Sequence, residues 1–188
     1  EFVSLIASGA GAIGVNQAFM CNGANLAFRK ANYASVDIDK ASGDDVFLLH
    51  HAKNNGSEII FVKEQEAIVF TSPKADLKSL IQQRKRWAAK SSDYQDKDAK
   101  HISWLVFLCN LGLLLLLFFG TWSEVLIAFT LKAIFDYSFL KKAVVFFQKE
   151  EIFRYFYPLQ IVYPFYIVYV AVASQIEDFE WKGRKYKK

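Results

Sequence analysis

This sequence of 188 residues has few cysteines, a single methionine and a small net charge. The two cysteines, Cys21 and Cys109, lie far apart and form no C-x-x-C pair, so a disulfide scaffold and a zinc ribbon are both excluded. The 23 basic and 19 acidic residues leave a net charge of only +4, which is too small to indicate a nucleic-acid partner. The sequence starts at Glu1 and its only methionine is Met20, which predicts a piece of a longer protein.

Hydrophobic residues are abundant instead, at 53% of the chain against 22% charged residues, which excludes a disordered protein. An uncharged run extends from Ile102 to Phe119, and Gly120–Trp122 lengthen it. A bilayer core of roughly 30 Å needs about 20 such residues in a helix. The run therefore predicts a transmembrane span at 102-122, and its internal position argues against a signal peptide.

Two further apolar segments follow, at 124-140 and 155-174. The first contains Lys132 and Asp136, and a charge at the bilayer centre costs about 2.5–3.5 kcal/mol on the insertion scale. Because these two residues are four apart, they share a helix face and can pair. The sequence predicts a membrane region over 102-175 with two to three spans, of which we favour three, and a basic tail over 176-188.

The distribution of basic residues gives a partial topology. Six of them precede the first span: Arg84, Lys85, Arg86, Lys90, Lys97 and Lys100. By the positive-inside rule, residues 1-101 are therefore expected in the cytoplasm. The loop at Lys141–Arg154 and the tail are both basic as well, so charge leaves the number of spans open.

The first hundred residues mix polar and apolar positions as a soluble domain does. Glu58–Lys63 and Ala67–Thr71 are rich in Ile, Val and Phe, which predicts two short strands joined as a hairpin. Asp76–Lys90 carries apolar residues at helical spacing, which predicts a helix. This part is therefore expected to contain both strands and helix.

Several short patterns match known motifs weakly. Gly9–Gly14 fits G-x-G-x-x-G, but the dinucleotide motif needs a strand before it and a helix opening at it, and asparagines follow here. His50-His51 near the acids is better read as a surface pair, because adjacent histidines point apart. The two D-x-D patterns, Asp37-x-Asp39 and Asp96-x-Asp98, are short acidic patches of a kind that arises by chance.

Three other features carry chemistry that fits together. Cys21-Asn22-Gly23 is a turn signal, and Gly43-Asp44-Asp45 places two carboxylates at a glycine turn. Such a carboxylate serves as a general base where it reaches a substrate hydroxyl, although an acidic pair also suits a helix N-terminus. Gln83, Arg86 and Trp87 share a helix face that offers an amide, a phosphate-binding guanidinium and an indole for a sugar ring. The other reading of this helix is a basic surface on anionic lipid.

The order N-G-A-N-x-A-F-R, G-D-D, Q-x-x-R-W, membrane spans and W-K-G-R resembles the family 2 glycosyltransferases. More narrowly, it resembles their membrane-integrated, cellulose-synthase-like bacterial members, which make polysaccharides. The resemblance covers nearly the whole chain, as the C-terminal half of such an enzyme. It implies an α/β fold in which residues 1-101 are the acceptor side of a GT-A-type domain, followed by transmembrane helices of the bacterial inner membrane.

The resemblance also implies residue roles. Asp45 matches the general base that deprotonates the acceptor hydroxyl, and Asp44 matches the acid that positions it. Gln83, Arg86 and Trp87 match the motif that holds the donor diphosphate and the acceptor sugar. The implied reaction is inverting transfer from a nucleotide-sugar donor to a glycan or lipid acceptor.

Cys21, Asn22 and Gly23 fall where the family lines the acceptor or diphosphate site. A divalent metal, Mg or Mn, is expected in the longer parent protein, with ligands outside this chain, because only 42 residues precede Gly43. Two other classes stay open. A non-catalytic membrane scaffold or transport component predicts that Asp45 is dispensable, and an oxidoreductase predicts a strand before Gly9.

Overall fold

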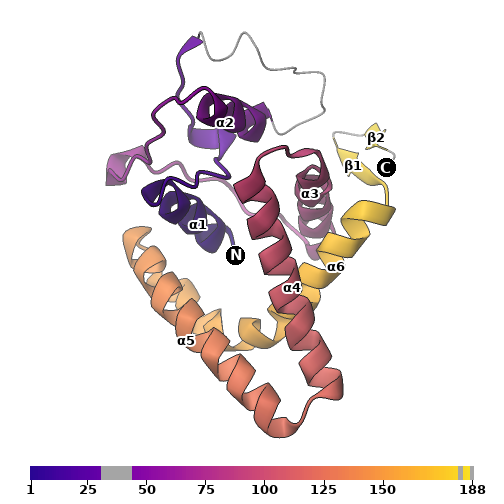
Figure 1. The fold of residues 1–188 in the computed structure, drawn as a ribbon. Coiled ribbons are helices and arrows are strands. Elements are labelled where there is room, and N and C mark those ends of the chain that lie inside the picture. Colours follow the sequence, from indigo (N-terminus) through magenta and orange to yellow (C-terminus); the bar gives the residue numbers. More distant parts are fainter. Residues whose placement is uncertain (31–43, 182–183, 187–188) are drawn as a thin grey trace. The chain divides into compact units, whose positions relative to one another are not determined.

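A computed structural model of the chain describes residues 1–30, 44–181 and 184–186 (Figure 1). The chain divides into two compact units, which we call unit 1 and unit 2. Unit 1 comprises Glu1–Ser72 and Tyr94–Lys100, and unit 2 comprises Pro73–Asp93 and His101–Lys188. The Gln83, Arg86 and Trp87 motif therefore belongs to the same unit as the apolar helices, and not to the unit that contains Asp45.

Unit 1 is built from helices and short 3-10 turns. Its complete elements are α1 (Phe2–Gly14), η1 (Gly23–Asn25), α2 (Asp44–Asn54) and η3 (Gln65–Ala67). Two carboxylates, Asp44 and Asp45, open α2, where the helix macrodipole favours negative charge. The apolar core of the unit is small, and its buried side chains are those of Ala18, Val46, Leu48, Leu49 and Ala99.

Unit 2 contains the long apolar helices. Its elements are α3 (Leu77–Ala89), η4 (Ser91–Asp93), α4 (Lys97–Phe119, which begins in unit 1), α5 (Trp122–Phe146), η5 (Glu150–Tyr155), α6 (Phe156–Ile176), β1 (Phe179–Trp181) and β2 (Arg184–Tyr186). Helix α3 matches the predicted helix over 76–90, and the side chain of Asp76 caps it by accepting from the backbone N–H of Ser79. It packs against α6 and β1. Thr121 and Glu124 form a capping box that starts α5, and Figure 1 shows α4 and α5 diverging from this turn.

The predicted α/β fold class is wrong: the fold is helical. The strands among the described residues are β1 and β2, which pair antiparallel with Phe179 opposite Tyr186. The segments 58–63 and 67–71 form no ladder, and the side chains of Ile60, Val62, Val69 and Phe70 are each more than half exposed. Strand-forming residues are stable in a sheet only when a partner strand and a packed face cover them. The described residues provide neither, so the two segments form no sheet and the turn η3 lies between them.

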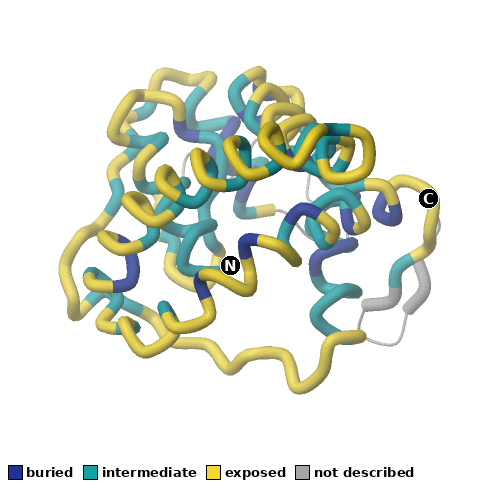
Figure 2. Tube along the Cα trace, turned by 90° about the horizontal axis from the view of Figure 1, so that it is seen from below, coloured by how far each residue is buried: buried dark blue, intermediate teal, exposed yellow. Residues whose placement is uncertain are grey.

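Among the described residues, two segments are long and apolar enough to cross a membrane by length and composition, Lys97–Phe119 and Glu150–Ile176. They overlap the predicted spans at 102-122 and 155-174. Large apolar side chains stand exposed along the helices, as in Trp104, Phe118 and Phe135. Figure 2 colours the chain by burial, with exposed residues in yellow. Exposed apolar surface of this extent supports association with a membrane. The remaining predicted segment, 124-140, lies within helix α5, which carries Lys132 and Asp136.

Candidate functional site

The predicted general base, Asp45, lies in the first turn of α2 and is held against the turn at Cys21–Gly23. Its Oδ2 accepts a hydrogen bond of 2.8 Å from the backbone N–H of Gly23. The Cys21 thiol donates in turn to the backbone carbonyl of Asp45, at 3.2 Å. Residues that the sequence assigned to one site from two separate motifs are therefore in direct contact within unit 1.

The contact continues along the rest of α2. His50 Nε2 lies 2.9 Å from the carbonyl oxygen of Phe19, and Lys53 Nζ donates to the carbonyl of Ala18, also at 2.9 Å. Residues 18–23 therefore run along α2 in the opposite direction to the helix. Ala18 lies at Lys53 in the last turn of α2, and Gly23 lies at Asp45 in its first turn. Polar contacts of side chains with backbone fix this segment at both ends of the helix.

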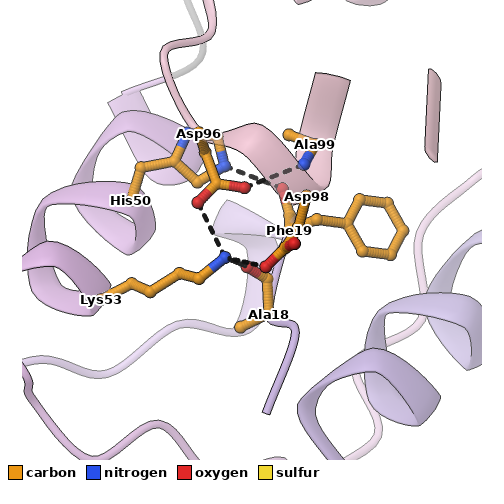
Figure 3. A network of polar contacts seen from close by, with 7 residues as sticks. All are labelled: Ala18, Phe19, His50, Lys53, Asp96, Asp98 and Ala99. Atoms are coloured by element: carbon orange, nitrogen blue, oxygen red, sulfur yellow. Dashed lines mark hydrogen bonds and ion pairs between the residues drawn. The ribbon is translucent and has the colours of Figure 1, made fainter. Parts of the chain in front are cut away.

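Lys53 is also the centre of a charged cluster (Figure 3). Its Nζ lies 2.7 Å from Oδ2 of Asp96 and 2.7 Å from Oδ2 of Asp98. The other carboxylate oxygen of Asp96 accepts from the backbone N–H of Ala99, at 2.8 Å, which caps the start of α4. The side chain of Asp96 is only 5% exposed.

The charges of this cluster stabilise one another. Burial lowers the pKa of Lys53, but its hydrogen bonds to Asp96 and Asp98 outweigh that effect and raise the pKa above 10.5. Burial likewise raises the pKa of Asp96, yet the hydrogen bonds from Lys53 and Ala99 outweigh it and lower the pKa below 3.8. At neutral pH the lysine and Asp96 are therefore charged.

Two residues of the 21–23 turn, Gly23 and Cys21, lie directly against Asp45. A Cβ on Gly23 would lie 3.2 Å from Oδ2 of Asp45, so a side chain there would press on the carboxylate. Burial, together with the nearby charges of Asp45 and Asp44, raises the pKa of the Cys21 thiol to about 12, so Cys21 stays neutral and unreactive. These two residues act on Asp45 by shape and hydrogen bonding.

The remaining predicted residues of unit 1 have different surroundings. Asn22 accepts from the backbone N–H of Ala24 at 3.0 Å, so its side chain shapes the turn η1. Asp44 is exposed in the first turn of α2, directly before Asp45. Gly43 of the G-D-D motif lies outside the described residues.

In unit 2, helix α3 places Gln83, Arg86 and Trp87 on one face, as their spacing predicts. Arg84, for which the sequence predicts no binding role, completes this group. Its guanidinium lies 4.3 Å from the centroid of the Trp87 ring and donates to Oε1 of Gln83 at 3.1 Å. The spacing of three residues between Arg84 and Trp87 is the signal that marks this cation–π pair.

The basic run on α3 is not all available to a membrane surface. Arg84 is buried, and Lys85 is 3% exposed and pairs with Glu177 at 2.5 Å. Lys85 also donates to the backbone carbonyl of Asp178, at 3.2 Å. These contacts anchor α3 to the chain that follows α6.

The structure also decides several of the weaker motifs. Gly9, Gly11 and Gly14 all lie inside the helix α1, and the residues directly before Gly9 are helical and not a strand, so the strand–turn–helix that the dinucleotide motif needs is not formed at Gly9–Gly14. His50 is buried, contrary to the predicted surface pair, whereas His51 contacts Asn55.

The two D-x-D patterns differ in what can be said of them. Asp96-x-Asp98 holds Lys53, and Asp37-x-Asp39 lies outside the described residues. Within the part of the chain that the structure describes, no group of three or more His, Cys, Asp or Glu side chains could hold a metal ion.

Comparisons with known proteins found no family model that matches this chain, and no curated protein or solved structure that is significantly similar to it. The assignment of a site therefore depends on the chemistry of the residues and on their contacts. The contact that joins two separate motifs, between Asp45 and the 21–23 turn, is the strongest of these.

Proposed function

We propose that this chain is the acceptor-side part of an inverting glycosyltransferase of the bacterial inner membrane. It transfers a sugar from a nucleotide-sugar donor to a glycan or lipid acceptor at the cytoplasmic face, as part of a longer protein. The observation that carries the proposal is the hydrogen bond between Asp45 and Gly23, because it unites the predicted base with the predicted acceptor-site turn. The two apolar helical segments agree with a membrane enzyme.

Asp45 is the base in this reaction. Its carboxylate accepts the proton of the acceptor hydroxyl, and the hydroxyl oxygen forms a bond to the anomeric carbon while the bond to the leaving diphosphate breaks. Attack from the opposite face inverts the configuration at that carbon. Hydrogen bonds from the backbone N–H groups of Gly23 and Val46 orient the carboxylate, and each oxygen keeps a second acceptor position for the substrate.

The face of α3 supplies the binding groups. Arg86 stabilises negative charge on the departing diphosphate, Gln83 adds an amide, and the Trp87 indole stacks on a sugar ring. The Arg84 guanidinium over the indole fixes the orientation of that ring, which suits a stacking platform. The burial of Arg84 and Lys85 favours this role over broad contact with anionic lipid.

A divalent metal is part of the proposal only for the longer protein. The described residues do not offer a set of ligands that fits one. We therefore assign no metal ligand in this chain and derive no step through a metal.

The test is sugar incorporation from a labelled donor by the full-length protein in membranes. Asp45→Asn keeps the shape of the side chain but removes its basicity, so transfer is expected to fall by about 10²–10⁴-fold with little change in binding of the nucleotide diphosphate. Glu58→Gln is the matched control, because Glu58 is an exposed carboxylate of the same unit. Transfer by Asp45→Asn at the wild-type rate would refute the proposal and favour a non-catalytic membrane component.

A further inference from the structure

We propose that Lys53 is a positioning residue for the base Asp45, a role that rests on the function proposed above. The two residues stand at opposite ends of α2, eight positions or about 12 Å apart along the helix axis. A helix of this length moves as a rigid rod, so the contacts at its far end determine where its first turn points. Lys53 makes three of those contacts, to Ala18, Asp96 and Asp98.

Lys53 joins three segments that are distant in sequence. It belongs to the last turn of α2, it donates to Ala18 in the segment that leads to the 21–23 turn, and it donates to Asp96 and Asp98 at the start of α4. The segment 18–23 thus contacts Asp45 at one end, through Gly23, and Lys53 at the other end, through Ala18. Loss of this ammonium would release both the helix and the turn that together orient the carboxylate.

The hydrogen bonding of Lys53 shows why it positions and does not bind substrate. An ammonium group has three N–H donors, and here they meet three acceptors: the Ala18 carbonyl and one oxygen each of Asp96 and Asp98. No donor is left for a diphosphate or a sugar hydroxyl. The two aspartate oxygens are each 2.7 Å from Nζ, so they lie at most 5.4 Å apart and would repel each other without the lysine.

The role predicts a specific kinetic pattern in the full-length protein in membranes. Lys53→Met keeps the length of the side chain and removes the charge, and kcat is expected to fall about 10–100-fold, because small displacements of a catalytic group have effects of this size. The KM for the donor should stay within about twofold. Lys53→Arg retains a cation with several donors and should recover much of kcat. Lys63→Met, at an exposed lysine of the same unit, is the control and should behave as wild type.

Asp98→Asn provides a milder variant in case Lys53→Met fails to accumulate. It keeps the Asp96 pair and weakens only one of the two, at a side chain that is 30% exposed, so kcat should fall about 2–5-fold with donor KM unchanged. A folded Lys53→Met or Asp98→Asn protein with wild-type kcat would overturn the proposal. So would a loss that appears in KM alone, or a Lys53→Arg variant no better than Lys53→Met.

Hydrogen exchange separates this proposal from the proposed function. Two backbone amides report on the positioning: that of Gly23, which donates a hydrogen bond to Asp45, and that of Ala99, which donates one to Asp96. Both amides should exchange faster in Lys53→Met than in Lys63→Met. If the wild-type protein transfers no sugar, the proposed function fails, and unchanged exchange would independently refute the positioning by Lys53. If transfer occurs and exchange is unchanged, only the role of Lys53 is refuted.

Discussion

Lys53 in unit 1 and Lys132 in unit 2 are both held by aspartates, but the charges of their clusters differ. Lys53 meets two carboxylates, Asp96 and Asp98, so its cluster carries one net negative charge. Lys132 pairs with Asp136 on α5 and donates to the neutral amide oxygen of Gln160 on α6, at 2.6 Å. The second cluster is therefore neutral.

The difference follows from the surroundings of each lysine. Unit 1 carries charged and polar residues on its surface, and water can screen an uncompensated charge there. Lys132 lies on a helix of apolar residues, where an unpaired charge is expensive and a neutral set is tolerated. The pairing is the arrangement that a third span at α5 would need, and Gln160 links it to α6. Helix α5 is not among the described helices that are long and apolar enough to cross a membrane, so the third span stays a prediction.

The same substitution can be made separately at each of the two lysines, and within this comparison the largest effect is expected at Lys132. Lys132→Met leaves Asp136 without its cation, and an unpaired charge in a span costs about 2.5–3.5 kcal/mol on the insertion scale, or roughly 100-fold in insertion. We expect a large loss of full-length protein from the membrane fraction, measured by immunoblot. Lys53→Met should stay within about twofold of wild type in the same measurement, because its cluster precedes the uncharged run that the sequence predicts as the span at 102-122.

A compensating variant identifies the cause of that loss. Lys132→Met combined with Asp136→Leu removes both charges and should restore the amount of inserted protein. If Lys132→Met alone accumulates like wild type, α5 does not lie in lipid and the chain has two spans.

The same comparison shows what could be predicted from the sequence. Lys132 and Asp136 are four residues apart, so their pairing is a local property of a helix and was predicted. Helix α3 was predicted for the same reason, from the spacing of its apolar residues. The contact of Lys53 with Asp96 links residues 43 positions apart, and no local pattern reports such a contact.

The failed predictions have a related cause. The strands expected at 58–63 and 67–71 have the composition of a sheet, but a strand forms only with partners that a single segment does not specify. His50 and His51 were expected as a surface pair because adjacent histidines point apart, whereas His50 packs against Tyr94 and contacts the carbonyl of Phe19 and is buried. The joining of Asp45 to Gly23 was implied by the resemblance to a family, not by the spacing of the two residues.

A smaller effect is expected at Gly23, and it distinguishes positioning from insertion. In Gly23→Ala the new Cβ would lie 3.2 Å from Oδ2 of Asp45, which displaces the carboxylate or its hydrogen bond. Sugar transfer should fall about tenfold while the amount of protein in the membrane is unchanged. Gly11→Ala is the matched control, because a Cβ at that exposed helical position meets nothing within 4 Å. Equal transfer by the two variants would show that Gly23 does not constrain the base.

The smallest effect concerns pH and only the cluster of unit 1. The pKa of Asp96 in the folded protein is below its ordinary value of 3.8, so its contribution to stability is present above that value and is lost as the pH falls through the folded pKa. The pKa of Lys53 is above 10.5, so its contribution is present below that value and is lost as the pH rises through the folded pKa. Between these limits the cluster should hold α2 in place unchanged. Peptides covering residues 94–99 should therefore show constant protection from hydrogen exchange from about pH 5 to pH 9, after correction for the intrinsic rate, and reduced protection only as the pH falls below the ordinary carboxyl value of 3.8. In Lys53→Met the protection should already be reduced at pH 7, with a smaller further change on acidification. A loss of protection in the wild-type protein between pH 5 and pH 7 would contradict this account, because Asp96 and Lys53 both keep their charge over that range.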